Sequence, residues 1–244
     1  MPILLAGWLA VPAGALWAQP APVSKLTYAV EWRLIRGGTV VVDLPRSTAA
    51  SPSQARVKID SAGLVTALYK VDDTYDVQFG DNLCATATTL DALQGRRHRR
   101  VEVRYERALK RGFYNERDVL RGTVLRTAEI DVPACVHDVL GGLLMLRGMN
   151  LEPGQNTQIP MSDGRRFAQV RVDSQTHEDV TTPAGQFKAT RYEAFLMSGV
   201  VYPRNGRVFI WISDDERRLP VQMQIRLNFP IGTVTLRLEK ESPP

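Results

Sequence analysis

Two pairs of adjacent aspartates could perform chemistry in this sequence. Asp72 and Asp73 lie in YKVDDTYDV, and Asp214 and Asp215 lie in FIWISDDERRLP. Two carboxylates roughly 5 to 10 Å apart can hydrolyse a glycosidic bond. Aspartates at strand ends are also common in turns, because their side chains accept hydrogen bonds from nearby backbone N–H groups. We favour the turn for residues 214–219. A carboxylate-dependent hydrolase acting on cell-wall glycan remains the alternative.

Cys84 and Cys135 are the two cysteines, and the histidines number three. An even pair in an exported chain predicts one disulfide, which would close a loop of about 50 residues. Two free thiols, or a metal site that uses Cys135 and His137, are the alternatives. Zinc requires three or four suitably spaced ligands, and the chain has no CxxC motif, so we predict no metal site.

Other catalytic signatures do not occur in the sequence. It contains no GxSxG, GxGxxG, P-loop or HExxH motif, and His137 beside Asp138 in sequence does not make a triad. We therefore assign no catalytic residue and no cofactor. A non-enzymatic protein is the favoured interpretation.

The net charge is +5, and the most basic region comprises GRRHRR (95–100) and RYERALKRG (104–112). Few aromatic residues interleave with these charges, which single-stranded nucleic-acid sites usually require. We interpret the region as the solvated outer face of a strand with a basic turn, and we expect no nucleic-acid partner.

Residues 1–18, MPILLAGWLAVPAGALWA, are typical of a secretory signal peptide, although they lack a basic beginning. Prolines and glycines interrupt this stretch, so a membrane-spanning helix is disfavoured. The predicted organisation is a leader at 1–18, with an uncertain end, followed by a single β-rich domain at 19–244. The predicted location is the periplasm or cell envelope, with no membrane span after removal of the leader.

Period-two alternation of apolar and polar residues dominates the remainder of the chain. In LTYAVEWRLI and RRVEVRYER, apolar residues occupy one face and charged residues the other. Such strands at short intervals indicate an antiparallel sheet. Turn residues separate the strands, and Asn205-Gly206 predicts a tight hairpin.

One helix is predicted near residues 136–149, in CVHDVLGGLLMLRGM, with Asp138 as a possible cap of its first turn. Because the helix has almost no polar face, it should be buried. The predicted fold class is therefore all-β and mainly antiparallel: a strongly curved sheet, half-barrel or barrel with one buried helix. Trp32, Tyr69 and Trp211 are candidate aromatic residues for lining a ligand cavity, and simple core packing is the alternative.

Several of these segments together resemble the bacterial domain of unknown function 3108 family. They are SAGLVTALYKVDDTYDVQF, CVHDVLGGLLMLR, TPAGQFKATRYE and VFIWISDDERRLPVQMQIRLNFPIGTVTLRLE. The resemblance implies an exported, predominantly β-stranded protein and supplies no catalytic residue. The interpretation that follows is a non-enzymatic binding module for an apolar or amphipathic envelope component, with a lipid or a lipoprotein as possible partners.

Overall fold

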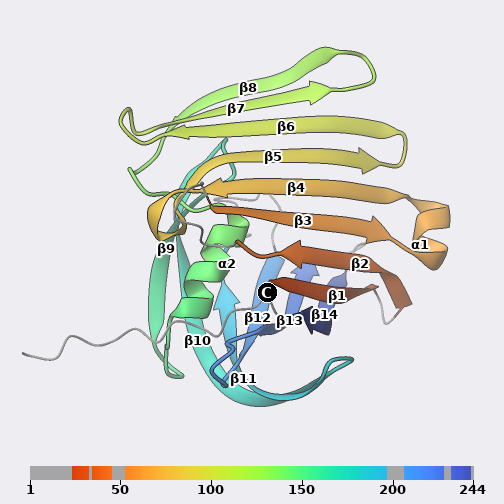
Figure 1. Cartoon of the computed structure of the whole chain (residues 1–244), viewed down its shortest axis with the longest axis vertical. Helices are drawn as coiled ribbons and strands as arrows, with labels where there is room; N and C mark the ends of the chain where they lie inside the picture. Colours follow the sequence, from red (N-terminus) through yellow and green to blue (C-terminus); the bar gives the residue numbers. More distant parts are fainter. Residues whose placement is uncertain (1–23, 33–34, 46–52, 197–205, 228–231, 243–244) are drawn as a thin grey trace, which may run out of the picture.

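Fourteen strands form one continuous antiparallel sheet in the computed structural model, which describes residues 24–32, 35–45, 53–196, 206–227 and 232–242 (Figure 1). The predicted leader and Asn205 lie outside these residues. The strands are β1 Lys25–Trp32, β2 Ile35–Asp43, β3 Ser53–Ser61, β4 Val71–Phe79, β5 Ala85–Gln94, β6 Arg97–Glu106, β7 Arg111–Asp118, β8 Thr123–Asp131, β9 Asn156–Ser162, β10 Phe167–Thr182, β11 Gly185–Ala194, β12 Gly206–Ser213, β13 Pro220–Leu227 and β14 Thr233–Ser242.

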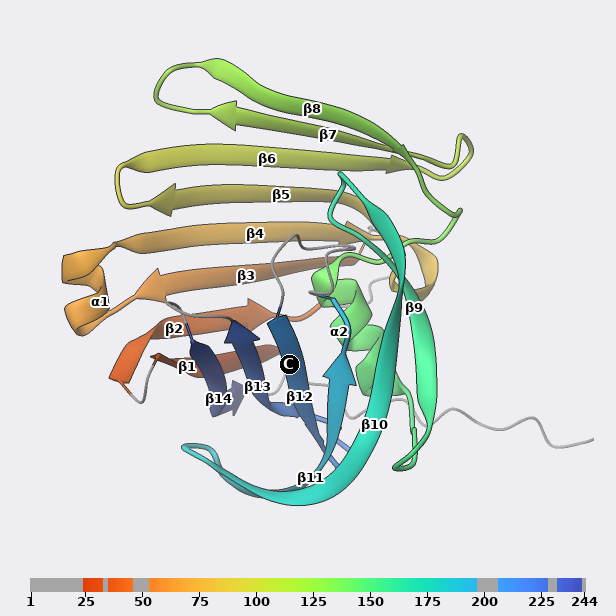
Figure 2. The ribbon, with the colours of Figure 1, turned by 180° about the vertical axis from the view of Figure 1, so that it is seen from behind.

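The strand order is β8-β7-β6-β5-β4-β3-β2-β1-β14-β13-β12-β11-β10-β9. Every neighbouring pair except β1 and β14 joins strands that are consecutive in the chain. Among the described residues β8 and β9 are the two edges, so the strongly curved sheet does not close into a barrel (Figures 1 and 2). The predicted all-β, antiparallel architecture is confirmed, in its open form.

The sheet has two arms, one made of β1 to β8 and the other of β9 to β14. The helix α2, Val139–Gly148, lies on the concave side between these arms (Figure 2). It begins after Asp138, whose carboxylate accepts hydrogen bonds from the backbone N–H groups of Leu140, at 3.1 Å, and Gly141, at 2.8 Å. The Tyr75 hydroxyl of β4 donates a third bond to the same carboxylate at 2.8 Å. Asp138 therefore caps the helix, as predicted, and joins it to the sheet.

The burial of α2 is less complete than its sequence predicts. Leu140 and Leu146 are buried, but Val139 is 41% exposed and Leu143 is only partly buried. Instead, the polar Arg147 is buried, because its guanidinium finds backbone carbonyl partners in the turn that follows β12. The helix therefore packs against the sheet along one face only, and its first residue, Val139, lies at the surface.

A disulfide joins Cys84, immediately before β5, to Cys135, in the segment that leads to α2, with their Cα atoms 5.0 Å apart. Two residues further, His137 forms a short parallel bridge with Met161 of β9. The segment 132–138 thus connects the arm that contains β5 with the edge strand of the opposite arm. A further short helix, α1, spans Gly63–Leu68, and a 3-10 turn, η1, spans Asp81–Leu83.

The segment 214–219 connects β12 and β13 as bends and turns, which supports the turn interpretation of the SDDERRLP sequence. The Ser213 hydroxyl accepts a hydrogen bond from the Leu219 N–H at 2.8 Å and donates one to Asp215 at 2.7 Å. The preceding strand is buried from Val208 to Ser213, because Phe209 and Trp211 belong to one core cluster and Ile210 and Ile212 to another.

Candidate ligand-binding pocket

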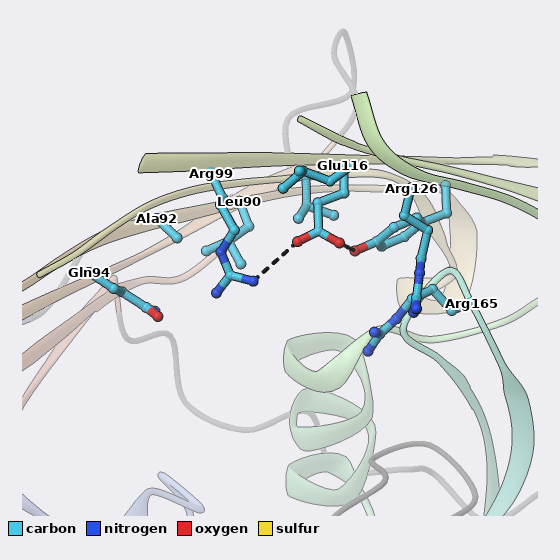
Figure 3. Close-up of a pocket in the computed structure, with 10 residues that line it drawn as sticks. Leu90, Ala92, Gln94, Arg99, Glu116, Arg126 and Arg165 are labelled. Carbon is cyan, nitrogen blue, oxygen red and sulfur yellow. Dashed lines mark hydrogen bonds and ion pairs between the residues drawn. The ribbon is translucent and has the colours of Figure 1, made fainter. Parts of the chain in front are cut away.

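A pocket of about 450 Å³ lies on the concave face of β5 to β8, near the β8 edge (Figure 3). Strand alternation places its residues, because the side chains of β6 and β7 that share a face with the core residues Val103 and Tyr114 also face the pocket. Part of its wall is apolar and part is polar. The lining residues are Leu90, Ala92, Gln94, Arg99, Val101, Tyr114, Glu116, Leu125, Arg126 and Arg165.

Glu116 of β7 is held by two donors from the pocket lining. The Arg99 guanidinium donates to one carboxylate oxygen at 3.2 Å, and the Tyr114 hydroxyl donates to the other at 2.9 Å. Burial, followed by the hydrogen bond to Glu116, raises the pKa of Tyr114 to about 12, so this phenol stays protonated and donates. Glu116 is thus engaged through both oxygens.

Arg165 reaches the pocket from the loop between β9 and β10. Its guanidinium forms an ion pair with Asp163 at 2.6 Å and lies over the Tyr114 ring, 5.6 Å from the centroid. Gly164 permits this approach, because its φ is +85° and an added Cβ would come within 2.6 Å of Val103. The SDGRR turn therefore packs directly against the opposite arm of the sheet.

Arg126 completes the pocket from the edge strand β8. Its side chain is exposed and has no ionic or hydrogen-bonding partner within the part of the chain that the structure describes. Arg126 and Arg165 both line the pocket, and their side chains lie at the same end of it in Figure 3. Glu116 and Asp163 are ion-paired with two of the three lining arginines, so Arg126 is the lining arginine without an ion-pair partner among the described residues.

The structure does not bring the two aspartate pairs together. Asp72 is ion-paired with Lys58, and the hydrogen bond from Lys58 lowers the Asp72 pKa. Asp214 accepts a hydrogen bond from Thr190 at 2.6 Å and lies 3.1 Å from a ring nitrogen of His177. The two pairs share no ionic or hydrogen-bonding partner among the described residues, and β4 and β12 are well separated in the strand order.

Asp73 is the member of these pairs that comes nearest to the pocket. It is buried, and it accepts a hydrogen bond at 2.5 Å from Gln94, a lining residue. Burial raises the pKa of the Asp73 carboxyl, and its other oxygen is buried without a partner. We interpret Asp73 as a neighbour that fixes the position of Gln94.

Of the three aromatic residues predicted to line a cavity, none lines this pocket. Tyr69 is half exposed and its ring contacts the backbone turn at Gly95. Trp211 is 5% exposed and donates its indole N–H to Glu178 at 2.8 Å. Trp32 ends β1, on the far side of four intervening strands from β6. We therefore place the candidate ligand contacts at the pocket residues instead.

The interpretation of the basic region 95–112 as an outer face was incomplete. Arg99 shares its face with Val101 and Val103, and it points into the concave side, whereas Arg100 and Arg104 alternate with them. Period-two alternation in RRHRRVEV already contained this signal. Arg126 and Arg165 had no comparable signal, because their proximity to Arg99 depends on how the sheet curves.

The geometry defines a curved, open antiparallel sheet with a pocket on its concave face, and solved structures of this class exist. A β-barrel-like protein of domain of unknown function DUF1849 from Brucella abortus is 9% identical, with a TM-score of 0.58; 93% of this chain and 99% of that chain are covered. Two weaker likenesses are a proposed exported protein of YmcC-like fold from Bacteroides fragilis (12% identity, TM-score 0.36, 91% and 97% covered) and a proposed lipoprotein from Parabacteroides distasonis (9%, 0.35, 93% and 98%).

The chain belongs to the family described as protein of unknown function (DUF3108), whose model matches residues 27–239. No curated protein matches the chain. The described part of the chain contains no helix both long and apolar enough to cross a membrane.

Proposed function

We propose that this protein is an exported, non-enzymatic binding protein of the cell envelope that holds an amphipathic component in its concave pocket. The observation that carries this proposal is the mixed lining. Apolar side chains from three strands lie beside three arginines in one space. At about 450 Å³ the pocket falls within the range of small-molecule sites.

The apolar wall comprises Leu90 and Ala92 of β5, Val101 of β6 and Leu125 of β8. A ligand with an apolar part would bury surface against these residues, and such burial stabilises by about 25 cal/mol per Å². Leu125 is 49% exposed, so a ligand can reach the pocket from the β8 edge. A purely polar solute would leave this wall in contact with water.

Native mass spectrometry of protein purified from envelope extracts without detergent tests the proposal. We expect a bound amphipathic molecule in wild type and its loss in Leu125→Asp, which places a charge in the apolar wall. Leu120→Asp is the matched control, because Leu120 is 69% exposed in the turn after β7 and does not line the pocket. Equal retention by both variants, or no bound amphiphile in wild type, would contradict the proposal.

The proposed export rests on the composition of residues 1–18 and is supported by the disulfide, because disulfides persist mainly in oxidising compartments. Fractionation of cells that produce the full chain should recover a shortened, oxidised protein in the periplasmic or envelope fraction. Recovery of the full-length, reduced chain in the cytoplasm would contradict export without bearing on the pocket.

A further inference from the structure

The pocket arginines differ in how their charges are balanced. Arg99 is paired with Glu116 at 3.2 Å and Arg165 with Asp163 at 2.6 Å. Arg126 has no such partner among the described residues, although it lines the same pocket as Arg165 (Figure 3). Arg126 and Arg165 are thus two cations in one pocket, only one of which has an ion-pair partner, so an anion bound in the pocket would offset their repulsion.

Building on the proposed function, we infer that the ligand is an amphiphile with a single negative charge on its head group, held between Arg126 and Arg165. Arg126 is the one lining arginine without an ion-pair partner among the described residues, and one anionic group would pair with it. Guanidinium groups bind carboxylate and phosphate oxygens through paired hydrogen bonds. The chemistry therefore fits a fatty-acid carboxylate or a lipid phosphodiester.

The two arginines are already positioned by different means. Asp163 accepts two side-chain bonds from Arg165, at 3.1 and 2.6 Å, so this guanidinium is fixed before a ligand arrives. Arg126 follows Leu125 on the edge strand β8, where it lies directly opposite Glu116 of the neighbouring strand β7. With its head group between Arg126 and Arg165, the ligand would place its hydrocarbon chain against Leu125 and the rest of the apolar wall.

The position of the head group has a structural consequence. Arg126 belongs to β8, one edge of the sheet, whereas Arg165 belongs to the loop that follows β9, the other edge. A bound anion would join the two arms of the open sheet at this end. We therefore expect the ligand to raise the melting temperature as well as to bind.

Calorimetric titration of the full oxidised protein with four probes tests the inference: decanoate, dioctanoyl phosphatidylglycerol, decanol and inorganic phosphate. We expect at least one of the two monoanionic amphiphiles to bind about tenfold or more tightly than decanol, and phosphate alone to bind more weakly. The tighter of the first two identifies the head group as a carboxylate or a phosphodiester. High salt should weaken their binding, because Arg126 is exposed.

Substitutions separate the head-group contacts from general effects of charge. Arg126→Gln should weaken the anionic amphiphile about tenfold, and Arg126→Lys should recover part of the loss. Arg104→Gln is the matched control, since Arg104 lies on the opposite face of the sheet, with its side chain 68% exposed, and should leave binding unchanged. Because Arg126 is exposed, the variant should fold, and circular dichroism verifies this.

The possible failures are distinguishable. Equal binding of decanol and decanoate, or an unchanged affinity in Arg126→Gln, overturns the anionic head group and leaves the proposed amphiphile binding intact. Binding of phosphate as tight as that of decanoate supports the anion site but contradicts the proposed function. Binding of none of the four probes overturns both.

Discussion

Arg147 and Arg218 each donate hydrogen bonds from the side chain to the backbone of the other's segment. The Arg147 Nε donates to the Arg218 carbonyl at 3.0 Å, and Arg218 donates to the carbonyls of Arg147, at 3.4 Å, and Met149, at 2.7 Å. The last turn of α2 is thereby attached to the turn between β12 and β13. Burial lowers the pKa of the Arg147 guanidinium. The SDDERRLP sequence thus has a structural role in positioning the helix.

The contribution of Arg218 can be separated into side chain and backbone. Arg218 has a φ of +47°, a conformation that favours glycine. Arg218→Ala should lower the free energy of unfolding by about 2 kcal/mol, because it removes the bonds that the Arg218 side chain donates to α2 and leaves their carbonyl acceptors unpaired. Arg218→Gly removes the same bonds but relieves backbone strain, so it should be about 1 kcal/mol more stable than Arg218→Ala. Urea unfolding measures both, and equal stability would contradict the strain.

Removal of the disulfide should destabilise the protein by about 4 kcal/mol, the value that loop entropy gives for a separation of 51 residues. The double variant Cys84→Ala, Cys135→Ala and the reduced wild-type protein should both show this loss in guanidinium unfolding. A loss in the variant but none on reduction would instead indicate that packing of the cysteine side chains matters.

Asp215 should support stability only where it is ionised. Burial raises the pKa of its carboxyl, but hydrogen bonds from Ser213 and Arg217 outweigh burial and lower it. A carboxyl with a lowered pKa in the folded state stabilises the protein above its unfolded pKa of about 4, and this stability is lost as the pH falls through the folded value. Asp215→Asn should therefore cost less than about 1 kcal/mol at pH 7, since the site is partly exposed, and nothing in strong acid. Thermal melts between pH 7 and 2 check this.

Asp73 should show the opposite dependence on pH. Burial raises the pKa of this carboxyl, so the folded state binds a proton more tightly than the unfolded state, and stability falls as the pH rises through the folded pKa. Asp73→Asn should raise the free energy of unfolding by about 1 kcal/mol at pH 7, because it removes a buried charge with one unpaired oxygen. The gain should vanish below about pH 4. A destabilised variant at pH 7 would contradict this role.

The burial pattern of α2 predicts which of two charge substitutions, Leu146→Asp or Leu143→Asp, destabilises the protein more. Leu146 is 1% exposed, whereas Leu143 is partly buried between the two core clusters. Leu146→Asp should prevent folding or cost more than about 4 kcal/mol, because an unpaired carboxylate would be buried. Leu143→Asp should also be destabilising, but by less. Circular dichroism and urea unfolding give the order, and the reverse order would contradict the packing of α2.

Much of the fold could be predicted from local patterns. Alternation identifies the strands because one side chain in two faces the core, and Asp138 marks the start of α2 because the carboxylate accepts the first free N–H groups. Alternation cannot predict that β1 pairs with β14, or that the sheet stays open, since both depend on contacts between residues far apart in sequence.

The candidate site was harder to predict for the same reason. Arg99 could have been found, because it alternates in phase with the apolar residues of β6. Arg126 and Arg165 look like ordinary surface arginines in sequence, and only the approach of the SDGRR loop to β7 places them together. Arg147 was equally hidden, because an arginine at the end of a helix usually faces water.

The strand order has a consequence for how the molecule assembles during synthesis. Every strand pairing except that of β1 with β14 joins strands that are made one after the other, so hairpins can form locally and quickly. One edge of β1 lacks its hydrogen-bonding partner until β14, Thr233–Ser242, has been made. Until then β1 presents an unpaired edge, the kind of surface that promotes aggregation. The pairing of β1 with β14, which joins the run β1–β8 to the run β9–β14, can therefore form only after nearly the whole chain has been made.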